Sequence, residues 1–154
     1  MEVISVDLNE IYTQLIMEHS SSKHNRRSLE NANLCEKGHN PSCGDEITLE
    51  IKVNGDTIED LAFSGQGCAI SQASTSMMID LLKGKNKDEA LELVDKFIGM
   101  IKREIDDEDL LEDLEDAIVL KNISNMPARV KCAVLAWHTI KEAFNKPLLF
   151  IHIK

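Results

Sequence analysis

The chain has 154 residues, of which 43% are hydrophobic, and this is enough for one domain with a hydrophobic core. Its formal net charge of −10 argues against nucleic acids and anionic membranes as partners, because both repel a negatively charged surface. The six aromatic residues leave little surface for stacking on nucleobases or sugars.

The N-terminal segment lacks the basic and then apolar pattern of a secretion signal, and no stretch approaches the roughly 20 apolar residues that span a bilayer. We therefore expect a soluble, cytoplasmic protein. In a reducing cytoplasm, four cysteines are more often thiols or metal ligands than disulfides.

Residues 7–19 are predicted to form a helix, and the polar segment 20–40 a loop with room for one short strand. Asp7 and Glu10 have the spacing of a capping box. The apolar residues that follow at helical period are Leu8, Ile11, Tyr12, Leu15 and Ile16. This pattern indicates a helix that packs one face on the core.

A β-hairpin is predicted next. Its first strand alternates apolar and polar residues at Ile47, Leu49, Ile51 and Val53. Asn54-Gly55 follows, a pair preferred in type I′ turns because both turn positions need positive φ. The return strand covers about residues 57–64, and its alternation slips between Ile58 and Leu61, which indicates a β-bulge.

Four more helices are predicted after the hairpin, the third of them in the acidic segment 104–116. One covers residues 68–82, and the next begins at Asn86 or Asp88. The last begins near Pro127, where a missing N–H costs nothing. Its buried side is assigned to Val130, Val134, Trp137 and Phe144, and Cys132 falls outside that stripe. Met77 and Met78 are interpreted as core residues rather than metal ligands.

Segment 104–116 holds nine acidic residues and no basic one, so the rest of the chain carries a net charge of only −1. Leu110, Leu111, Leu114 and Ile118 lie at helical spacing among the acids. This predicts an amphipathic α-helix with a solvated outer face. A recruitment surface for a basic partner is the alternative interpretation. The apolar tail, residues 147–154, is interpreted as an edge segment or an intermolecular contact.

Three cysteines lie in a turn or at a helix start. Cys43 stands beside a proline and a glycine before the hairpin, and Cys68 follows two glycines directly after it. The hairpin therefore brings these two cysteines close together. Cys132 lies in the first turns of the last helix, where Arg129 and Lys131 would stabilise a thiolate. Three thiols placed to ionise predict a metal site.

Three thiolates suit zinc in tetrahedral geometry. Asp45, two residues after Cys43, is the candidate fourth ligand. A carboxylate is the hardest ligand of such a set, so the metal could exchange this ligand while the three cysteines keep the site together. Cys35 and His39 lie in the upstream loop and are interpreted as bystanders.

These segments resemble the NifU N-terminal/IscU/SufU family of iron–sulfur cluster assembly proteins. The motifs that carry the resemblance are Asn40-Pro41-Ser42-Cys43-Gly44-Asp45, Phe63-Ser64-Gly65-Gln66-Gly67-Cys68-Ala69-Ile70-Ser71-Gln72-Ala73-Ser74 and Pro127-Ala128-Arg129-Val130-Lys131-Cys132-Ala133. The resemblance implies one domain over residues 1–154 with an α+β fold of the SufE/NifU type. In that fold a small antiparallel sheet is packed on one side by about five helices. It also implies a site for zinc or an iron–sulfur cluster, with the ligands Cys43, Asp45, Cys68 and Cys132.

Two departures from IscU-type scaffolds are similar to the SufU branch. Lys131 stands where those scaffolds have histidine, and the segment between the second and third cysteines is longer, with the extra length near residues 104–116. The SufU branch is understood as a zinc-dependent partner of a cysteine desulfurase of the SufS type. It accepts sulfane sulfur as a cysteine persulfide.

We predict Cys43 as the persulfide acceptor, because its glycine-flanked loop is the most mobile of the three. Arg129 and Lys131 are predicted to offset the charge of the site or to contact the partner. The alternative function is a scaffold on which a [2Fe–2S] cluster is built and passed to downstream cluster assembly proteins or apo-proteins. A structural zinc domain with an unrelated role is a third interpretation.

Overall fold

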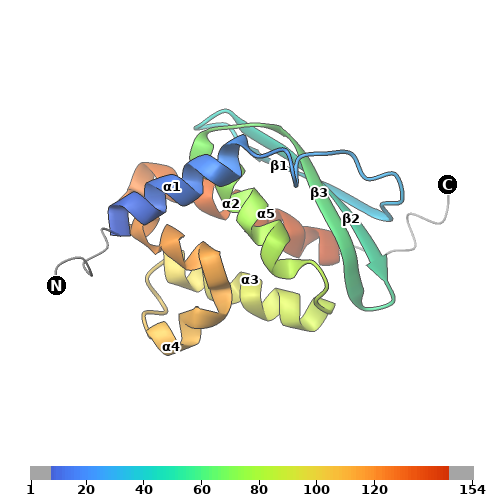
Figure 1. The fold of residues 1–154 in the computed structure, drawn as a ribbon. Helices are drawn as coiled ribbons and strands as arrows, with labels where there is room; N and C mark the ends of the chain where they lie inside the picture. The colour runs from blue at the N-terminus through green and yellow to red at the C-terminus, as the bar shows by residue number, and fades with distance from the viewer. Residues whose placement is uncertain (1–7, 146–154) are drawn as a thin grey trace.

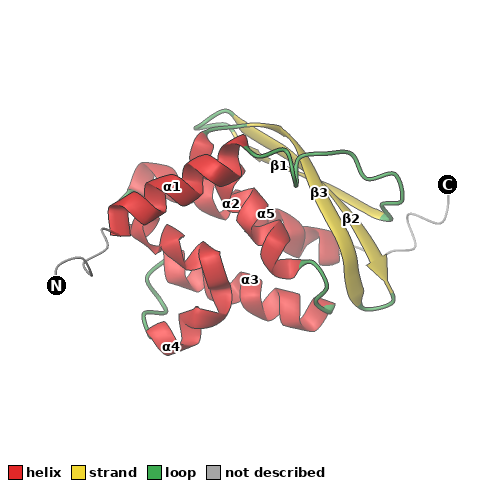
Figure 2. Cartoon of the chain, viewed as in Figure 1, coloured by secondary structure: helices red, strands yellow, loops and turns green. Residues whose placement is uncertain are grey.

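The structure, a computed structural model, describes residues 8–145, with side chains from Thr13 onward. In chain order the elements are α1 (Leu8–Ser21), β1 (Leu34–Asn40), β2 (Asp45–Asn54), β3 (Thr57–Gln66), α2 (Ala69–Leu82), α3 (Lys87–Ile101), α4 (Glu108–Leu111), η2 (Glu112–Asn125) and α5 (Pro127–Phe144). The helices gather on one side of the sheet (Figures 1 and 2), which confirms the expected α+β architecture. Asp7 and the 147–154 tail lie outside the described residues.

The sheet has three antiparallel strands in the order β1-β2-β3. The alternation predicted for β2 is confirmed, since its inward side chains, Ile47, Leu49, Ile51 and Val53, are all buried. α5 packs on β1 and β2, and α2 packs on β3. Within residues 8–145, no helix has both the length and the apolar character needed to cross a membrane.

The hairpin between β2 and β3 has the predicted bulge. Lys52 pairs with Asp60 but Val53 pairs with Ile58, so Glu59 is the extra residue of β3. The bulge keeps the apolar residues of β3 on the core side of the sheet despite the slip in their alternation.

The predicted type I′ turn at Asn54-Gly55 is wrong. Asn54 pairs with Thr57, so the two-residue loop is Gly55-Asp56. Gly55 has φ 65°, whereas Asn54 is not among the residues with positive φ. Because Asn54 continues the extended strand, the left-handed conformation falls on the glycine, which has no Cβ to oppose it.

The acidic segment is not the single α-helix that its leucines predicted. It contains a four-residue α-helix, α4, followed by the 3₁₀-helix η2, and Glu115 interrupts η2 with a φ of 53°. Leu110 is 51% exposed. The buried residues recur at every third position, at Leu111, Leu114, Ala117, Leu120 and Ile123. A spacing of three matches the 3₁₀-helix, in which residues three apart lie on one face, and this explains the difference.

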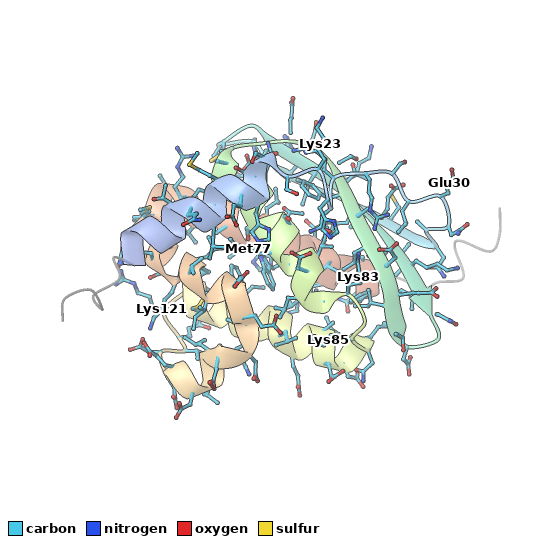
Figure 3. The ribbon with its side chains drawn as sticks, viewed as in Figure 1. Lys23, Glu30, Met77, Lys83, Lys85 and Lys121 are labelled. Carbon is cyan, nitrogen blue, oxygen red and sulfur yellow. The ribbon has the colours of Figure 1, made fainter. Side chains whose placement is uncertain are left out.

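α2 is the central helix, and most of its side chains are buried. Met77 lies among the helices (Figure 3) and is 2% exposed, and Met78 is fully buried, so their assignment to the core is confirmed. Asn86 caps α3 through a capping box with Glu89. The helix starts predicted at Cys68 and at Asn86 are therefore confirmed, as the N-caps of α2 and α3.

Ser74 connects α2 to α5 through two buried hydrogen bonds. Its hydroxyl accepts from Nε1 of Trp137 at 2.8 Å and donates to the Ala133 carbonyl at 2.6 Å. The Trp137 ring stacks on Phe97 of α3, with ring centroids 3.9 Å apart. One serine hydroxyl thus satisfies the polar atom of the largest side chain in the core.

Replacing Ser74 with alanine is expected to reduce the free energy of unfolding by about 1–3 kcal/mol, because the Trp137 N–H would stay buried without an acceptor. Urea unfolding followed by tryptophan fluorescence measures this change. Ser28→Ala, at an exposed loop position, is the control and should change stability by less than about 0.5 kcal/mol. Equal effects of the two substitutions would contradict the role assigned to Ser74.

Candidate metal centre

Cys43 lies in the short turn that joins β1 to β2. The turn is closed by a hydrogen bond from the Cys43 N–H to the Asn40 carbonyl at 3.3 Å. Gly44 follows with φ 72°, a conformation that an L side chain rarely adopts. The turn leaves Cys43 half-buried, while Ser42 and Gly44 on either side are exposed. This thiol is therefore reachable from outside the protein.

Asp45, the first residue of β2, is fully buried. Its Oδ1 accepts a hydrogen bond from the backbone N–H of Cys68 at 2.9 Å, which ties the start of β2 to the start of α2. Its Oδ2 is buried and has no hydrogen-bond partner among the described residues. An unpaired carboxylate oxygen in the interior is costly. A bound cation would satisfy it.

The loop before Cys68 fits closely around this carboxylate. A Cβ at Gly67 would stand 2.7 Å from Asp45 Oδ1, so only glycine allows the approach. The loop is held from two sides: Arg26 donates to the Gly65 carbonyl at 2.7 Å, and Gln72 donates to the Gly67 carbonyl at 2.8 Å. We call this loop, residues 65–67, the cradle of Asp45. Its backbone is held in place by these two hydrogen bonds.

Cys68 is the N-cap residue of α2, as the sequence predicted for a helix start. Its Sγ accepts a hydrogen bond from the Ser71 N–H at 3.5 Å. The thiol is half-buried beside the cradle. Such an N–H···S contact is compatible with metal ligation, because the sulfur keeps other lone pairs.

Cys132 is 1% exposed. Its Sγ lies 2.8 Å from the Cys43 Sγ and 3.9 Å from Nδ2 of Asn40. The Cys43 thiol also approaches the Ala128 carbonyl, at 4.0 Å. The expectation that Cys132 lies outside the buried side of its helix is wrong, because α5 packs against β1 and places this residue under the β1–β2 turn.

Burial, and then contacts with Cys43, Asp45 and Cys68, raise the pKa of Cys132 well above its usual range. The expectation that the helix start and its cations make Cys132 a thiolate is therefore wrong for the site without metal. Removal from water opposes the charged form more strongly than the nearby cations favour it.

Arg129 lies in the first turn of α5 and is exposed. A hydrogen bond to Cys132, and then the charge of the cysteines, raise the pKa of Arg129 above its usual value. Its guanidinium therefore faces the thiol cluster. Lys131 is exposed, and its predicted role stays a prediction.

Among the described residues, one group of side chains could hold a metal ion: the ligand atoms of Cys43, Asp45 and Cys132 lie within 4.8 Å of one another. Cys68 is adjacent, through its backbone bond to Asp45, but is not part of that group. Cys35 and His39 are exposed on β1 and do not belong to it either.

The donor set fits zinc. Two soft sulfurs and one carboxylate oxygen are in place, the unpaired Asp45 Oδ2 needs a positive partner, and the Cys68 sulfur is beside them. The Cys43 and Cys132 sulfurs lie 2.8 Å apart, so both would be available to hold one ion.

The sequence interpretation missed the residues that hold the cradle. Arg26 lies 39 residues before Gly65 and belongs to a basic segment that has the composition of a solvated loop. Gln72 binds the carbonyl of Gly67, five residues before it, and this separation is not one of the helical spacings that the sequence pattern reveals.

A family model described as the NifU-like N terminal domain matches residues 11–147 of this chain. An iron–sulfur cluster assembly scaffold protein IscU from Thermotoga maritima is 41% identical over 136 residues, which cover 88% of this chain and 94% of that protein. A zinc-dependent sulfurtransferase SufU from Bacillus subtilis is 39% identical over 143 residues, which cover 92% of this chain and 95% of that protein.

Among solved structures, this chain is similar to an iron–sulfur cluster assembly scaffold protein for the SUF system from Fervidobacterium islandicum AW-1. The TM-score is 0.80 at 43% sequence identity, and the match covers 88% of this chain and 97% of that chain. Sequence and fold agree over nearly the same span. The chain therefore belongs to the family of the NifU-like N-terminal domain, together with proteins named IscU and SufU.

Proposed function

We propose that this chain is a zinc-dependent sulfur acceptor in iron–sulfur cluster assembly and that a cysteine desulfurase is its sulfur donor. The observation that carries the proposal is the reachable Cys43 thiol, in contact with the buried Cys132 thiol and beside the unpaired oxygen of Asp45. The similarity to the Bacillus subtilis zinc-dependent sulfurtransferase over most of both chains supports it.

In the transfer step, the Cys43 thiolate attacks the outer sulfur of a persulfide on the desulfurase. A sulfur–sulfur bond forms to Cys43, and the bond within the donor persulfide breaks. The electron pair of the broken bond stays on the donor cysteine, which leaves as a thiolate. The step needs no other oxidant or reductant, because one persulfide replaces another.

Cys43, Cys68, Cys132 and Asp45 are the residues that would hold zinc. When bound, zinc would keep the thiols deprotonated at neutral pH. Asp45 is fixed by the Cys68 N–H and offers its second oxygen, so the carboxylate is already oriented before a metal enters.

Arg129 would offset the negative charge that several thiolates and a carboxylate bring to one site. Its guanidinium faces the thiol cluster from the exposed start of α5, so it is also placed to contact a docked partner. Lys131, exposed on the same helix, is proposed for the same two roles.

The second candidate function is a scaffold on which a [2Fe–2S] cluster is assembled and then passed to downstream proteins. The same thiols suit iron as well as zinc, and the Thermotoga maritima relative is named as a scaffold. Anaerobic reconstitution separates the two functions. A stable, visibly absorbing cluster that transfers to an apo-ferredoxin supports the scaffold, whereas zinc that iron does not displace supports sulfur transfer.

Cys43→Ala is expected to reduce the sulfur accepted from a desulfurase and radiolabelled cysteine by about tenfold or more, because the reachable thiol is lost. Protein-bound label after a single turnover measures this. Cys35→Ala removes an exposed cysteine of β1 outside the site and should accept as much sulfur as the unmodified chain. A Cys43→Ala protein with normal labelling would exclude Cys43 as the acceptor.

Asp45→Asn keeps the shape of the side chain but removes its charge. The affinity for zinc should fall by about tenfold or more, measured by competition with a chromophoric chelator. Asp56→Asn, at an exposed position of the hairpin loop, is the matched control and should bind zinc normally. Circular dichroism checks that both variants fold. Unchanged affinity in Asp45→Asn would exclude this carboxylate as a ligand.

The affinity for zinc should rise with pH. Because the pKa of Cys132 is raised, this thiol is protonated in the metal-free protein at neutral pH, and zinc binding must displace that proton. Each displaced proton contributes about a tenfold rise in affinity per pH unit between about pH 6.5 and 8.5. Chelator competition across this range measures the slope, which should become shallower in Cys132→Ser. A flat profile would show that no proton is released.

A further inference from the structure

We propose that Cys132 is a resolving cysteine: it attacks a persulfide on Cys43, forms a Cys43–Cys132 disulfide and releases the transferred sulfur as sulfide. This inference rests on the proposed function above, in which Cys43 accepts sulfur. It adds an activity, the conversion of sulfane sulfur into sulfide by the chain itself.

The geometry of the two thiols carries the proposal. The two Sγ atoms lie 2.8 Å apart, and the Cys132 thiol donates its hydrogen to the Cys43 sulfur. A sulfur–sulfur bond is about 2.05 Å long, so the two atoms need to approach by less than about 1 Å to be joined. Contact between two oriented reactants makes an intramolecular step far faster than attack by a thiol from solution.

Burial determines which thiol can reach which sulfur. Cys132 is 1% exposed, so a partner protein cannot load it directly, and the Cys43 sulfur lies 2.8 Å from its own sulfur. Cys43 is half-buried in an exposed turn, so its outer side remains open to a donor. Cys68 also lies near Cys132, but its sulfur accepts a hydrogen bond from the Ser71 N–H at the start of α2. The pair is thus asymmetric: one thiol meets the donor and the other lies behind it.

The step balances without a further reagent. The anionic outer sulfur of the persulfide first takes the proton of the Cys132 thiol, and the resulting Cys132 thiolate attacks the Cys43 Sγ. A sulfur–sulfur bond forms between Cys132 and Cys43, and the bond from the Cys43 Sγ to the outer sulfur breaks. The outer sulfur leaves with the electron pair and the proton, as hydrosulfide. The sulfane sulfur is reduced by two electrons, and the two cysteine thiols are oxidised to the disulfide.

The step belongs to the metal-free site. A zinc ion held by both cysteines would occupy the sulfur lone pairs that the attack requires. Bound zinc would therefore preserve a persulfide handed on by the chain, whereas loss of zinc would favour sulfide release. The metal content would then decide whether sulfur leaves as sulfane sulfur or as sulfide.

The test uses the full chain under anaerobic conditions, first with zinc bound and then after zinc has been removed by a chelator. In the first arm, a cysteine desulfurase is loaded with one sulfane sulfur, freed of excess cysteine and mixed with the zinc-loaded chain, and the chelator is added once the sulfur has been transferred. Released sulfide is measured colorimetrically, and peptides are mapped by mass spectrometry without reduction. We expect one Cys43–Cys132 disulfide for each sulfide released. Cys132→Ser should release sulfide about tenfold more slowly and retain the persulfide on Cys43.

A second arm loads the chain with inorganic polysulfide in place of the desulfurase. A Cys43–Cys132 disulfide in this arm after zinc removal, together with no sulfur uptake by the zinc-loaded chain from the desulfurase, would support the resolving step and overturn the proposed function. A Cys43 that stays a thiol or keeps its persulfide in this arm, or a disulfide that joins Cys43 to Cys68, would overturn the resolving role of Cys132. Cys35→Ser is the control and should behave as the unmodified chain in both arms.

Discussion

The hydrogen bond from the Cys68 N–H to Asp45 is the interaction on which the candidate metal centre depends. It joins the first residue of β2 to the residue that caps α2, and it fixes a fully buried carboxylate. Gly67 allows the close approach because it has no Cβ. This one bond fixes the start of β2 against the start of α2. The Cys43 and Cys68 thiols are thereby held near the Asp45 carboxylate.

The two contacting thiols combine different physical environments. Cys43 belongs to a turn at the surface, whereas Cys132 belongs to the core side of a long helix. A thiol that reacts with a partner protein must be accessible, whereas a thiol that only its neighbours should reach must be shielded from solvent. This site contains one thiol of each kind. The acidic residues belong to other elements, α4 and the start of η2, and Figure 1 draws α4 at the lower edge of the molecule, away from the strands. Most of the net negative charge of the chain therefore lies in elements that carry none of the candidate ligands.

Local periodicity predicted most of the fold. The alternation in β2, the bulge in β3 and the starts of α3 and α5 followed from patterns within a few residues. The 3₁₀ segment was missed because a spacing of three, from Leu111 to Ile123, was interpreted with a period of 3.6. Burial of Cys132 could not be predicted from its own helix, because α5 is packed on two sides. The contacts of Arg26 were equally hidden, since they depend on how distant segments meet.

The contact between Cys43 and Cys132 joins residues 89 positions apart in the chain. Any bond across it, through a metal or through sulfur, would close a loop that includes β2, β3 and all the helices from α2 to η2. In the chain-entropy model, closing a loop of this length removes about 4.5 kcal/mol of conformational freedom from the unfolded chain. The bonding state of two sulfur atoms would then contribute much of the free energy of unfolding of the whole domain. Thermal unfolding curves would therefore change when these sulfurs bind a metal or form a disulfide.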